Sequence, residues 1–502
     1  MAVDALTRSG EIPPSTRTAT SFLLPGGVGL LAAALFWLVH DALIDDGYIT
    51  LGYARNLAFH GHWGLIAEET ANTATAPLNV LLLAAGTALL RSPVAALGVL
   101  FVLSAVVLAL SLRRAALETG LPGWTGALGA GLVLLNPLVL SSAGLEVAPA
   151  AALLGVLLLS AVRPRPVLFG LATGALALLR LDLLLFAVVV LLGRPALWRG
   201  WARWLPIAAL ALPWFLWSWL HFGSAVPDTL LIKQLQESWG GWTVRDGIAL
   251  YVDFFPAAVL LSAVPAYTGA GFAVFLVLLR IRGRVPELWP WTLLGVGAVL
   301  HHYAYTLLGV PPYHWYYAPA VVGLCLLLAG GIGAMAPHRF AVVPALVAAV
   351  GVLAVSAAFA VQHGMPWRSA AITTNWAAPA EYARIGTELG RVVGDRTVAS
   401  PGEIGTLAYF CGCRIVDQFS DRGYLDERLR QRLDRAGSLE RTLLAWNHRH
   451  FEPTEPRPVD LVLRRAPGPG PDPRWTVGSP WSGTSHFVLE PRSPEHSVPG
   501  PR

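Results

Sequence analysis

The sequence has little charge, little cysteine and almost no lysine. Only 13% of its 502 residues are charged, against about a quarter in ordinary soluble domains, and this deficit excludes a purely soluble protein. Of the 36 Lys and Arg residues, Lys233 is the one lysine. Three cysteines are too few for a disulfide framework, and a bridge between Cys411 and Cys413, with one residue between them, is expected to be strained.

The chain also lacks the features of a nucleic-acid-binding or secreted protein. Its net charge is only +5, and its arginines stand in short clusters at the ends of apolar segments, which excludes nucleic acid as a partner. It carries no nucleotide-binding fingerprint. The first 20 residues are polar, and the first apolar stretch has no small-residue cleavage site before Asp41, which predicts an uncleaved first membrane span.

Apolar residues are abundant and unevenly placed. They make up 55% of the chain, and the mean hydropathy is +0.55. Long apolar stretches continue to about Val361, and the roughly 140 residues that follow are mixed and polar. The sequence therefore predicts a mainly α, polytopic helical membrane protein with a small C-terminal α/β domain. Twelve apolar segments are distinguishable, at 22–39, 77–90, 94–112, 124–142, 147–162, 166–180, 181–193, 204–220, 256–280, 289–309, 316–334 and 340–361.

The distribution of arginine indicates how many of these segments cross the membrane, because short cytoplasmic loops collect Lys and Arg. Segment 77–90 is shorter than the ~20 residues that a span needs. If it lies on the outer surface, all the arginine clusters face the cytoplasm, whereas if it spans, the later clusters face outward. We therefore expect eleven spans and an external C-terminal region. The clusters are Arg8 with Arg17, Arg113 with Arg114, Arg163 with Arg165, Arg194 with Arg199 and Arg203, Arg280 with Arg282 and Arg284, and Arg339.

This topology predicts a multi-pass protein of the plasma membrane with three parts. Residues 1–362 form a transmembrane module, in which 41–76 are the first external loop and 77–90 a surface helix. Residues 363–492 form an extracytoplasmic α/β domain, and residues 493–502 a disordered tail. In the α/β domain we expect helices near Pro379–Val393 and Gly402–Tyr409, and strands at Thr397–Ser400, Arg414–Asp417, Val459–Leu463 and His486–Leu489.

The external loops gather acidic side chains. Asp45 and Asp46 follow the first span directly and are expected to be exposed. They could act as general base for an acceptor hydroxyl or hold a divalent cation, or they could simply be solvated acids at a helix end. Glu146 could bind a sugar hydroxyl or cap a helix N-terminus. Arg180 and Asp182 are ionisable groups at membrane depth, which favours a substrate-binding role, with a mutual ion pair as the alternative.

Two further loops carry candidate ligands for a phosphate or a sugar. The first contains His221, Asp228 and Lys233. Lys233 is either a phosphate ligand or a chance surface lysine. The second is aromatic and contains His314, Trp315 and Tyr316. Its rings could stack on sugar or polyprenyl groups and its histidine could contact a phosphate, although interfacial aromatic belts also produce Trp and Tyr at this depth.

Taken in order, these residues resemble the GT-C glycosyltransferases, multispanning enzymes that use polyprenyl-phosphate sugars, and among them the actinobacterial arabinofuranosyltransferases. Two positions depart from the family pattern, since Leu181 stands where Pro is common and Asp228 where Asn is common. The resemblance covers most of the chain up to about Asp417. It rests on Asp45-Asp46-Gly47-Tyr48, Tyr53-Ala54-Arg55-Asn56, Gly144-Leu145-Glu146, Leu179-Arg180-Leu181-Asp182, Pro227-Asp228-Thr229, His314-Trp315-Tyr316-Tyr317 and Gly402-Glu403-Ile404-Gly405.

The resemblance implies a membrane glycosyltransferase of cell-wall biogenesis. It would move a sugar, with arabinofuranose favoured over mannose, from a polyprenyl-phosphate donor to an envelope glycan or protein acceptor on the extracytoplasmic face. The catalytic base carries over to Asp45 or Asp46, and Lys233, His314 or Arg55 would bind the donor phosphate. A divalent cation is the only cofactor considered. A transporter or flippase of lipid-linked sugars is the alternative, although such proteins place their sites near the midplane between repeats.

Overall fold

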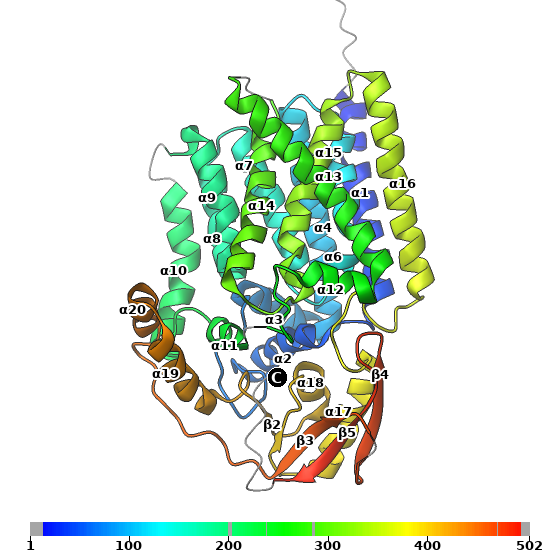
Figure 1. The fold of residues 1–502 in the computed structure, drawn as a ribbon. Coiled ribbons are helices and arrows are strands. Elements are labelled where there is room, and N and C mark those ends of the chain that lie inside the picture. Colours follow the sequence, from blue (N-terminus) through cyan, green and yellow to red (C-terminus); the bar gives the residue numbers. More distant parts are fainter. Residues whose placement is uncertain (1–13, 199–202, 237, 284–286, 469, 493–502) are drawn as a thin grey trace, which may run out of the picture.

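The structure is a computed structural model of the chain, and it describes residues 14–198, 203–236, 238–283, 287–468 and 470–492. The predicted tail 493–502 lies outside the described residues. The molecule has two parts (Figure 1): a bundle of long helices, and a smaller domain of mixed helices and strands packed against one end of the bundle.

The bundle is built from the apolar segments of the sequence. Within the described residues, eleven helical segments run along it if α5 and α6 count as one (Figure 1). The break between α5 and α6 falls at Pro137, which cannot continue a helix because it lacks a backbone N–H. The segments are α1 (Pro14–Val39), α4 (Pro93–Glu118), α5 (Trp124–Leu134) with α6 (Pro137–Ser141), α7 (Val147–Val162), α8 (Pro166–Leu179), α9 (Leu184–Gly193), α10 (Trp204–His221), α13 (Pro256–Ile281), α14 (Trp289–Leu308), α15 (Ala318–Ala334) and α16 (Arg339–His363).

By length and composition alone, four described helical stretches could cross a membrane: Pro93–Glu118, Pro256–Ile281, His314–Ala334 and Arg339–His363. Six shorter apolar helices accompany them. The outermost helix, α16, exposes Val343, Val347 and Val350 by 55%, 67% and 57%. A face of this kind requires apolar surroundings, since soluble proteins do not leave such long apolar surfaces in water.

Short helices cover the end of the bundle that meets the smaller domain. The segment expected to form the first external loop contains α2 (Asp45–His60), which is followed by Gly61 in a left-handed conformation. Helix α3 (Pro77–Leu90) occupies the segment expected to form a surface helix. Two more short helices, α11 (Thr229–Gln236) and α12 (Gly247–Phe254), follow α10. These helices lie at the end of the bundle that meets the C-terminal domain (Figure 1).

The C-terminal domain contains one five-stranded sheet with the strand order β2-β1-β3-β5-β4. Strand β1 is parallel to β2 and β3, and β5 is antiparallel to β3 and β4. Tyr382, Ile385 and Leu389 of α17 are buried in the hydrophobic core that this helix shares with the sheet. The elements are α17 (Pro379–Val393), β1 (Val398–Ala399), α18 (Gly405–Cys411), β2 (Ile415–Val416), α19 (Leu425–Arg435), α20 (Ser438–Asn447), β3 (Leu461–Ala466), β4 (Arg474–Ser479) and β5 (Gly483–Pro491).

This domain has features that were not predicted from the sequence. Strand β4, which follows a Pro/Gly-rich stretch, and the polar helices α19 and α20 were not expected. In addition, Cys411 and Cys413 form a disulfide, with their Cα atoms 5.0 Å apart. This separation lies within the usual range for disulfides, because Gly412 adopts a left-handed φ of 57° and turns the chain back.

Candidate active site

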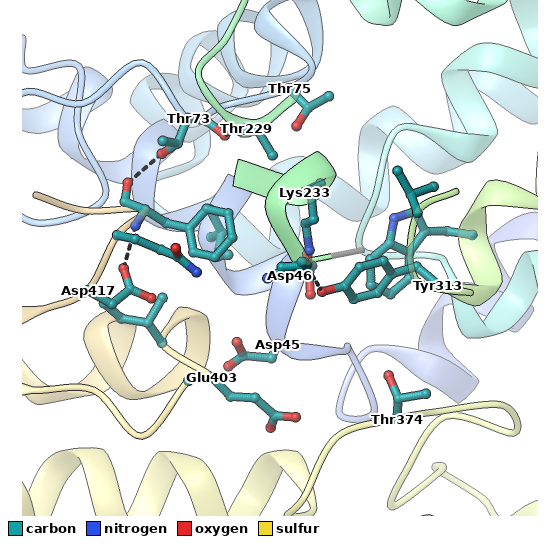
Figure 2. Close-up of a pocket in the computed structure, with 18 of the residues that line it drawn as sticks. Asp45, Asp46, Thr73, Thr75, Thr229, Lys233, Tyr313, Thr374, Glu403 and Asp417 are labelled. Carbon is teal, nitrogen blue, oxygen red and sulfur yellow. Dashed lines mark hydrogen bonds and ion pairs between the residues drawn. The ribbon is translucent and has the colours of Figure 1, made fainter. Parts of the chain in front are cut away.

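A cavity of about 1710 Å³ lies where the end of the bundle meets the C-terminal domain. Its walls come from α2, the segment before α3, the α8–α9 turn, α11, the aromatic loop and the C-terminal sheet. Figure 2 shows carboxyl groups from both parts of the chain turned toward the same space, with one ammonium group opposite them. The cavity is therefore polar where the two parts meet.

Asp45, the first residue of α2, joins the two parts of the molecule. Its Oδ2 accepts the backbone N–H of Gly405 at 2.9 Å and its Oδ1 that of Thr406 at 2.7 Å. A Cβ at residue 405 would overlap the Asp45 carbonyl oxygen, so this close approach requires glycine. Asp45 was expected to be exposed, but only 4% of it is. Burial raises its pKa to about 6, although the two backbone donors oppose the shift.

Asp46 is the more open of the two adjacent acids. Its side chain is 30% exposed, and its Oδ1 lies 3.9 Å from Nζ of Lys233. Burial raises the pKa of Asp46, and the ammonium group of Lys233 opposes this shift. Nζ of Lys233 also lies 3.5 Å from the centroid of the Tyr313 ring. The whole Lys233 residue is 9% exposed. Its ammonium group is held at the cavity wall between a carboxylate and an aromatic face.

Arg180 is fixed at the bundle side of the cavity by three partners. It donates to Glu146 at 2.8 Å, to Asp182 at 3.0 Å and to the hydroxyl of Tyr305 at 2.5 Å. Asp182 in turn contacts His301 at 2.8 Å. Arg180 and Asp182 therefore form the ion pair named as the alternative, and both line the cavity, so their substrate-binding role stays a prediction.

Three acids of the C-terminal domain, Glu403, Asp417 and Glu427, also line the cavity and were not singled out as site residues in the sequence. Burial raises the pKa of Glu403 to about 8, and the nearby Asp45 carboxylate adds to the shift. Burial likewise raises the pKa of Asp417 to about 7. The only sequence signal for Glu403 was its place in the Gly402-Glu403-Ile404-Gly405 motif. Its proximity to Asp45 depends on the packing of segments far apart in the chain.

Four predicted ligands are not among the described residues that line this cavity. Arg55 donates to the carbonyl of Tyr409 at 2.7 Å and stacks on that ring. His221 stacks on Trp217. His314 is fully buried, although its neighbours Trp315 and Tyr316 do line the cavity.

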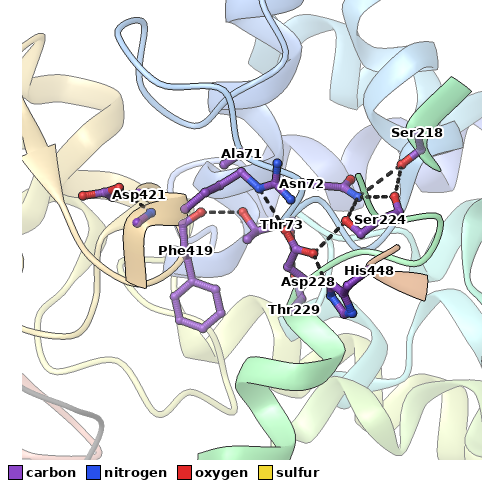
Figure 3. A network of polar contacts seen from close by, with 12 residues as sticks. Ala71, Asn72, Thr73, Ser218, Ser224, Asp228, Thr229, Phe419, Asp421 and His448 are labelled. Carbon is purple, nitrogen blue, oxygen red and sulfur yellow. Dashed lines mark hydrogen bonds and ion pairs between the residues drawn. The ribbon is translucent and has the colours of Figure 1, made fainter. Parts of the chain in front are cut away.

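Asp228, the fourth of these residues, lies in a buried polar junction (Figure 3). It accepts from Ser224 at 2.8 Å and from Arg422 at 3.3 Å, and its Oδ1 lies 3.5 Å from Nε2 of His448. Its backbone N–H donates to the carbonyl of Asn72 at 2.8 Å. Only 1% of its side chain is exposed. Through these contacts Asp228 connects the segment before α3 and the start of α11 to the C-terminal domain.

The acids of the cavity do not form an evident metal site. Among the described residues, no group of three or more His, Cys, Asp or Glu side chains is arranged to hold a metal ion. What the geometry brings together is a pair of adjacent carboxyls, further acids with raised pKa values and one ammonium group beside Asp46. These groups can exchange a proton with a ligand and bind an anion.

The fold is shared with solved membrane proteins. No protein-family model matches the chain, and no curated protein matches it. The structure is similar to the crystal structure of ArnT from Cupriavidus metallidurans bound to undecaprenyl phosphate, with a TM-score of 0.52 and 14% identity over 94% of this chain and 98% of that chain. The apo state of the same protein gives 0.51 and 15% over the same shares.

A weaker match is the cryo-EM structure of the arabinofuranosyltransferase AftD from Mycobacteria, with a TM-score of 0.44 and 18% identity over 75% of this chain and 29% of that chain. The likeness to ArnT confirms the expected fold, a polytopic helical bundle with a small C-terminal α/β domain. The chain therefore resides in a membrane.

Proposed function

We propose that the protein is a glycosyltransferase that moves a sugar from a polyprenyl-phosphate donor to a cell-envelope glycan or protein acceptor, with arabinofuranose as the favoured sugar and mannose as the other candidate. The observation that carries this proposal is the cavity at the end of the bundle, where Asp46 and Lys233 face each other. The ArnT fold, which in one crystal structure holds undecaprenyl phosphate, supports a lipid-linked donor.

The cavity has suitable surroundings for each part of such a donor. On the side of the bundle its lining includes Leu181, Leu230 and Leu308, which are 38%, 49% and 44% exposed. Exposed leucines at the membrane boundary suit an isoprenoid chain. Lys233, on the same helix as Leu230, lines the same cavity and would bind the phosphate as a compact point charge. Arg180 also lines the cavity, but its charge is already balanced by the carboxylates of Glu146 and Asp182, so Lys233 is the proposed phosphate ligand.

The two adjacent acids have different parts in this scheme. Both carboxylate oxygens of Asp45 already accept backbone N–H groups, whereas the Asp46 side chain is open to the cavity. Asp46 would take the proton of the acceptor hydroxyl as its oxygen bonds to the anomeric carbon of the sugar. The bond from that carbon to the phosphate oxygen breaks, and Lys233 stabilises the polyprenyl phosphate that leaves.

The proposal also places the cavity on the extracytoplasmic face. Arg113, Arg114, Arg163 and Arg165 lie near the ends of α4 and α7, away from the end of the bundle that meets the C-terminal domain (Figure 1). By the positive-inside rule the end of the bundle that carries these arginines is cytoplasmic, and the opposite end, which meets the C-terminal domain, is extracytoplasmic. Single cysteines at positions 113 and 450 test this in intact cells: a membrane-impermeant maleimide should label position 450 only, and labelling of position 113 would reverse the orientation.

Transfer by the purified full-length protein tests the reaction itself. Polyprenyl-phosphate arabinofuranose and polyprenyl-phosphate mannose are offered with an envelope glycan fraction, and the labelled sugar is followed into the acceptor. We expect transfer from one donor, lost in Asp46→Asn. Movement of intact labelled lipid across a vesicle membrane, without release of polyprenyl phosphate, would instead support a flippase.

A further inference from the structure

Partly buried aromatic rings and an arginine line the cavity where it is formed by the C-terminal domain and the loop after α11. Trp376 precedes α17, Arg465 lies on β3, and Trp481 lies in the turn between β4 and β5. A third ring, Trp239, comes from the loop after α11. We refer to Trp239, Trp376, Arg465 and Trp481 as the aromatic shelf. Its members come from three separate regions of the chain and line one cavity.

Hydrogen bonds and ring contacts connect the shelf. The guanidinium carbon of Arg465 lies 4.9 Å from the centroid of the Trp376 ring, and its Nε donates to Ser485 at 3.0 Å. The hydroxyl of Ser482, next to Trp481, donates to the carbonyl of Trp376 at 3.1 Å. These contacts hold the ring faces and the arginine in fixed positions, which reduces the ordering cost of binding a ligand.

The shelf leads toward the proposed reaction centre. The ring centroids of Trp481 and Trp239 lie 6.3 Å apart, and those of Trp239 and Tyr313 lie 4.7 Å apart. Tyr313 is the ring beneath Lys233. A ligand lying along the shelf would therefore reach Asp46 and Lys233 with one end, while its remainder lay against the C-terminal domain.

The chemistry of the shelf differs from that of the donor side. Next to its rings the lining is rich in hydroxyl groups and includes Ser400, Ser482, Thr484 and Ser485. Flat rings with adjacent hydroxyl and guanidinium groups suit the apolar faces and the hydroxyls of sugar rings. The cavity of about 1710 Å³ also exceeds the roughly 300–1,000 Å³ of pockets that hold one small ligand, so a second substrate has room beside the donor.

We infer that the aromatic shelf is the acceptor site and that the acceptor is a glycan chain, whose terminal sugar is presented to Asp46. This inference rests on the proposed function and narrows its acceptor from a glycan or protein to a glycan. The alternative is that the rings only pack the C-terminal domain against α12, because Trp481 also lies 4.5 Å from the ring of Phe254.

Equilibrium binding of soluble oligosaccharides to the full-length protein in detergent tests the inference without requiring transfer. The probes are a linear arabinofuranose hexasaccharide and a linear mannose hexasaccharide, with hexaethylene glycol as a chain of similar length that lacks sugar rings. We expect one hexasaccharide to bind and hexaethylene glycol not to bind. Trp481→Ala should weaken binding about tenfold, in line with the worth of an aromatic contact, and Trp481→Phe should restore most of it.

Two further variants separate binding from packing. Arg465→Ala removes a shelf residue that does not pack on α12 and should weaken binding about fivefold. Arg474→Ala removes an exposed arginine of β4 that does not line this cavity, and it should bind like the wild type. If neither hexasaccharide binds, or if Trp481→Ala and Arg465→Ala bind like the wild type, the shelf is not an acceptor site. Binding without transfer from either donor would contradict the proposed function alone.

Discussion

Two of the carboxylate–cation pairs near the junction of the bundle and the C-terminal domain differ in solvent access. Asp46 and Lys233 lie 3.9 Å apart with side chains 30% and 11% exposed. Asp228 and Arg422 lie 3.3 Å apart, and the side chain of Asp228 is 1% exposed. The first pair lines the cavity, whereas the carboxylate of the second is enclosed by Ser224 and His448.

The difference indicates how the same chemistry serves two purposes. A buried carboxylate with several donors stabilises one arrangement of the chain, and removal of it leaves its partners without compensation. In a pair with a longer separation at a cavity wall, such as Asp46 and Lys233, each side chain can leave its partner and contact a ligand instead. The open pair should therefore control transfer, and the enclosed pair should control stability.

The largest effect is expected from Asp46→Asn. If this carboxylate removes the acceptor proton, kcat should fall by about 10²- to 10⁴-fold while the thermal unfolding midpoint changes little. The matched control is Asp41→Asn, because Asp41 has a 61% exposed side chain at the end of the first helix and should keep full activity. Steady-state transfer measures both variants. Near-normal turnover in Asp46→Asn, with loss in Asp45→Asn, would transfer the role of base to Asp45.

A loss of stability of about 3 kcal/mol is expected from Asp228→Ala, because Arg422 loses its buried partner. Denaturant unfolding measures this loss. On α19, Asp426→Ala removes the carboxylate of an exposed pair with Arg430 and should cost less than about 0.5 kcal/mol. If Asp228→Ala kept its stability and lost only transfer, Asp228 would be a substrate ligand, as the resemblance implies.

Asp46 and Asp228 also show how far the sequence could be interpreted. Both are acids in loops predicted to face outward, and no local pattern separates the exposed one from the buried one. Asp228 is enclosed by His448 and Arg422, which lie about 200 residues later in the chain. Burial of this kind depends on long-range packing, and so does the pairing of Asp45 with Gly405 and Thr406.

Local patterns were sufficient elsewhere. Helix α17 has the predicted bounds Pro379–Val393, because Pro379 suits the first helical position and the apolar residues recur at helical spacing. The apolar segments of the bundle were found in the same way. The polar helices α19 and α20 were missed because they bury little: α20 has no buried residue and α19 has Leu425 and Leu429. Propensity alone is a weak signal for such helices.

A smaller effect on transfer is expected from changes at Lys233. Lys233→Ala should lower kcat/KM by about 10- to 10³-fold if it binds a partly desolvated phosphate. Lys233→Arg keeps the charge but replaces a point charge with a planar fork, so it should recover only part of the loss. Both are compared with the wild type at matched ionic strength, because exposed pairs are screened by salt. Full efficiency of Lys233→Ala at low salt would mean that Lys233 only packs against Asp46 and Tyr313 and does not bind the donor phosphate.

The smallest effect concerns Glu403, whose carboxyl lies on the cavity side of the C-terminal domain and accepts from Tyr382 and from the N–H of Trp376. Its pKa is about 8 in the folded protein, against an ordinary value of 4.5. The folded state therefore holds a proton that the unfolded chain releases, and this contribution to stability is complete below pH 4.5 and is lost as the pH rises toward 8.

Glu403→Gln keeps the acceptor oxygen and cannot ionise, so its thermal unfolding midpoint should fall less than that of the wild type between pH 5 and pH 8. Asp395→Asn, which removes an exposed carboxylate after α17, should follow the wild type. Identical pH dependence in Glu403→Gln and the wild type would mean that Glu403 is already ionised in the folded protein at these pH values. The cavity would then carry one more negative charge near Asp45.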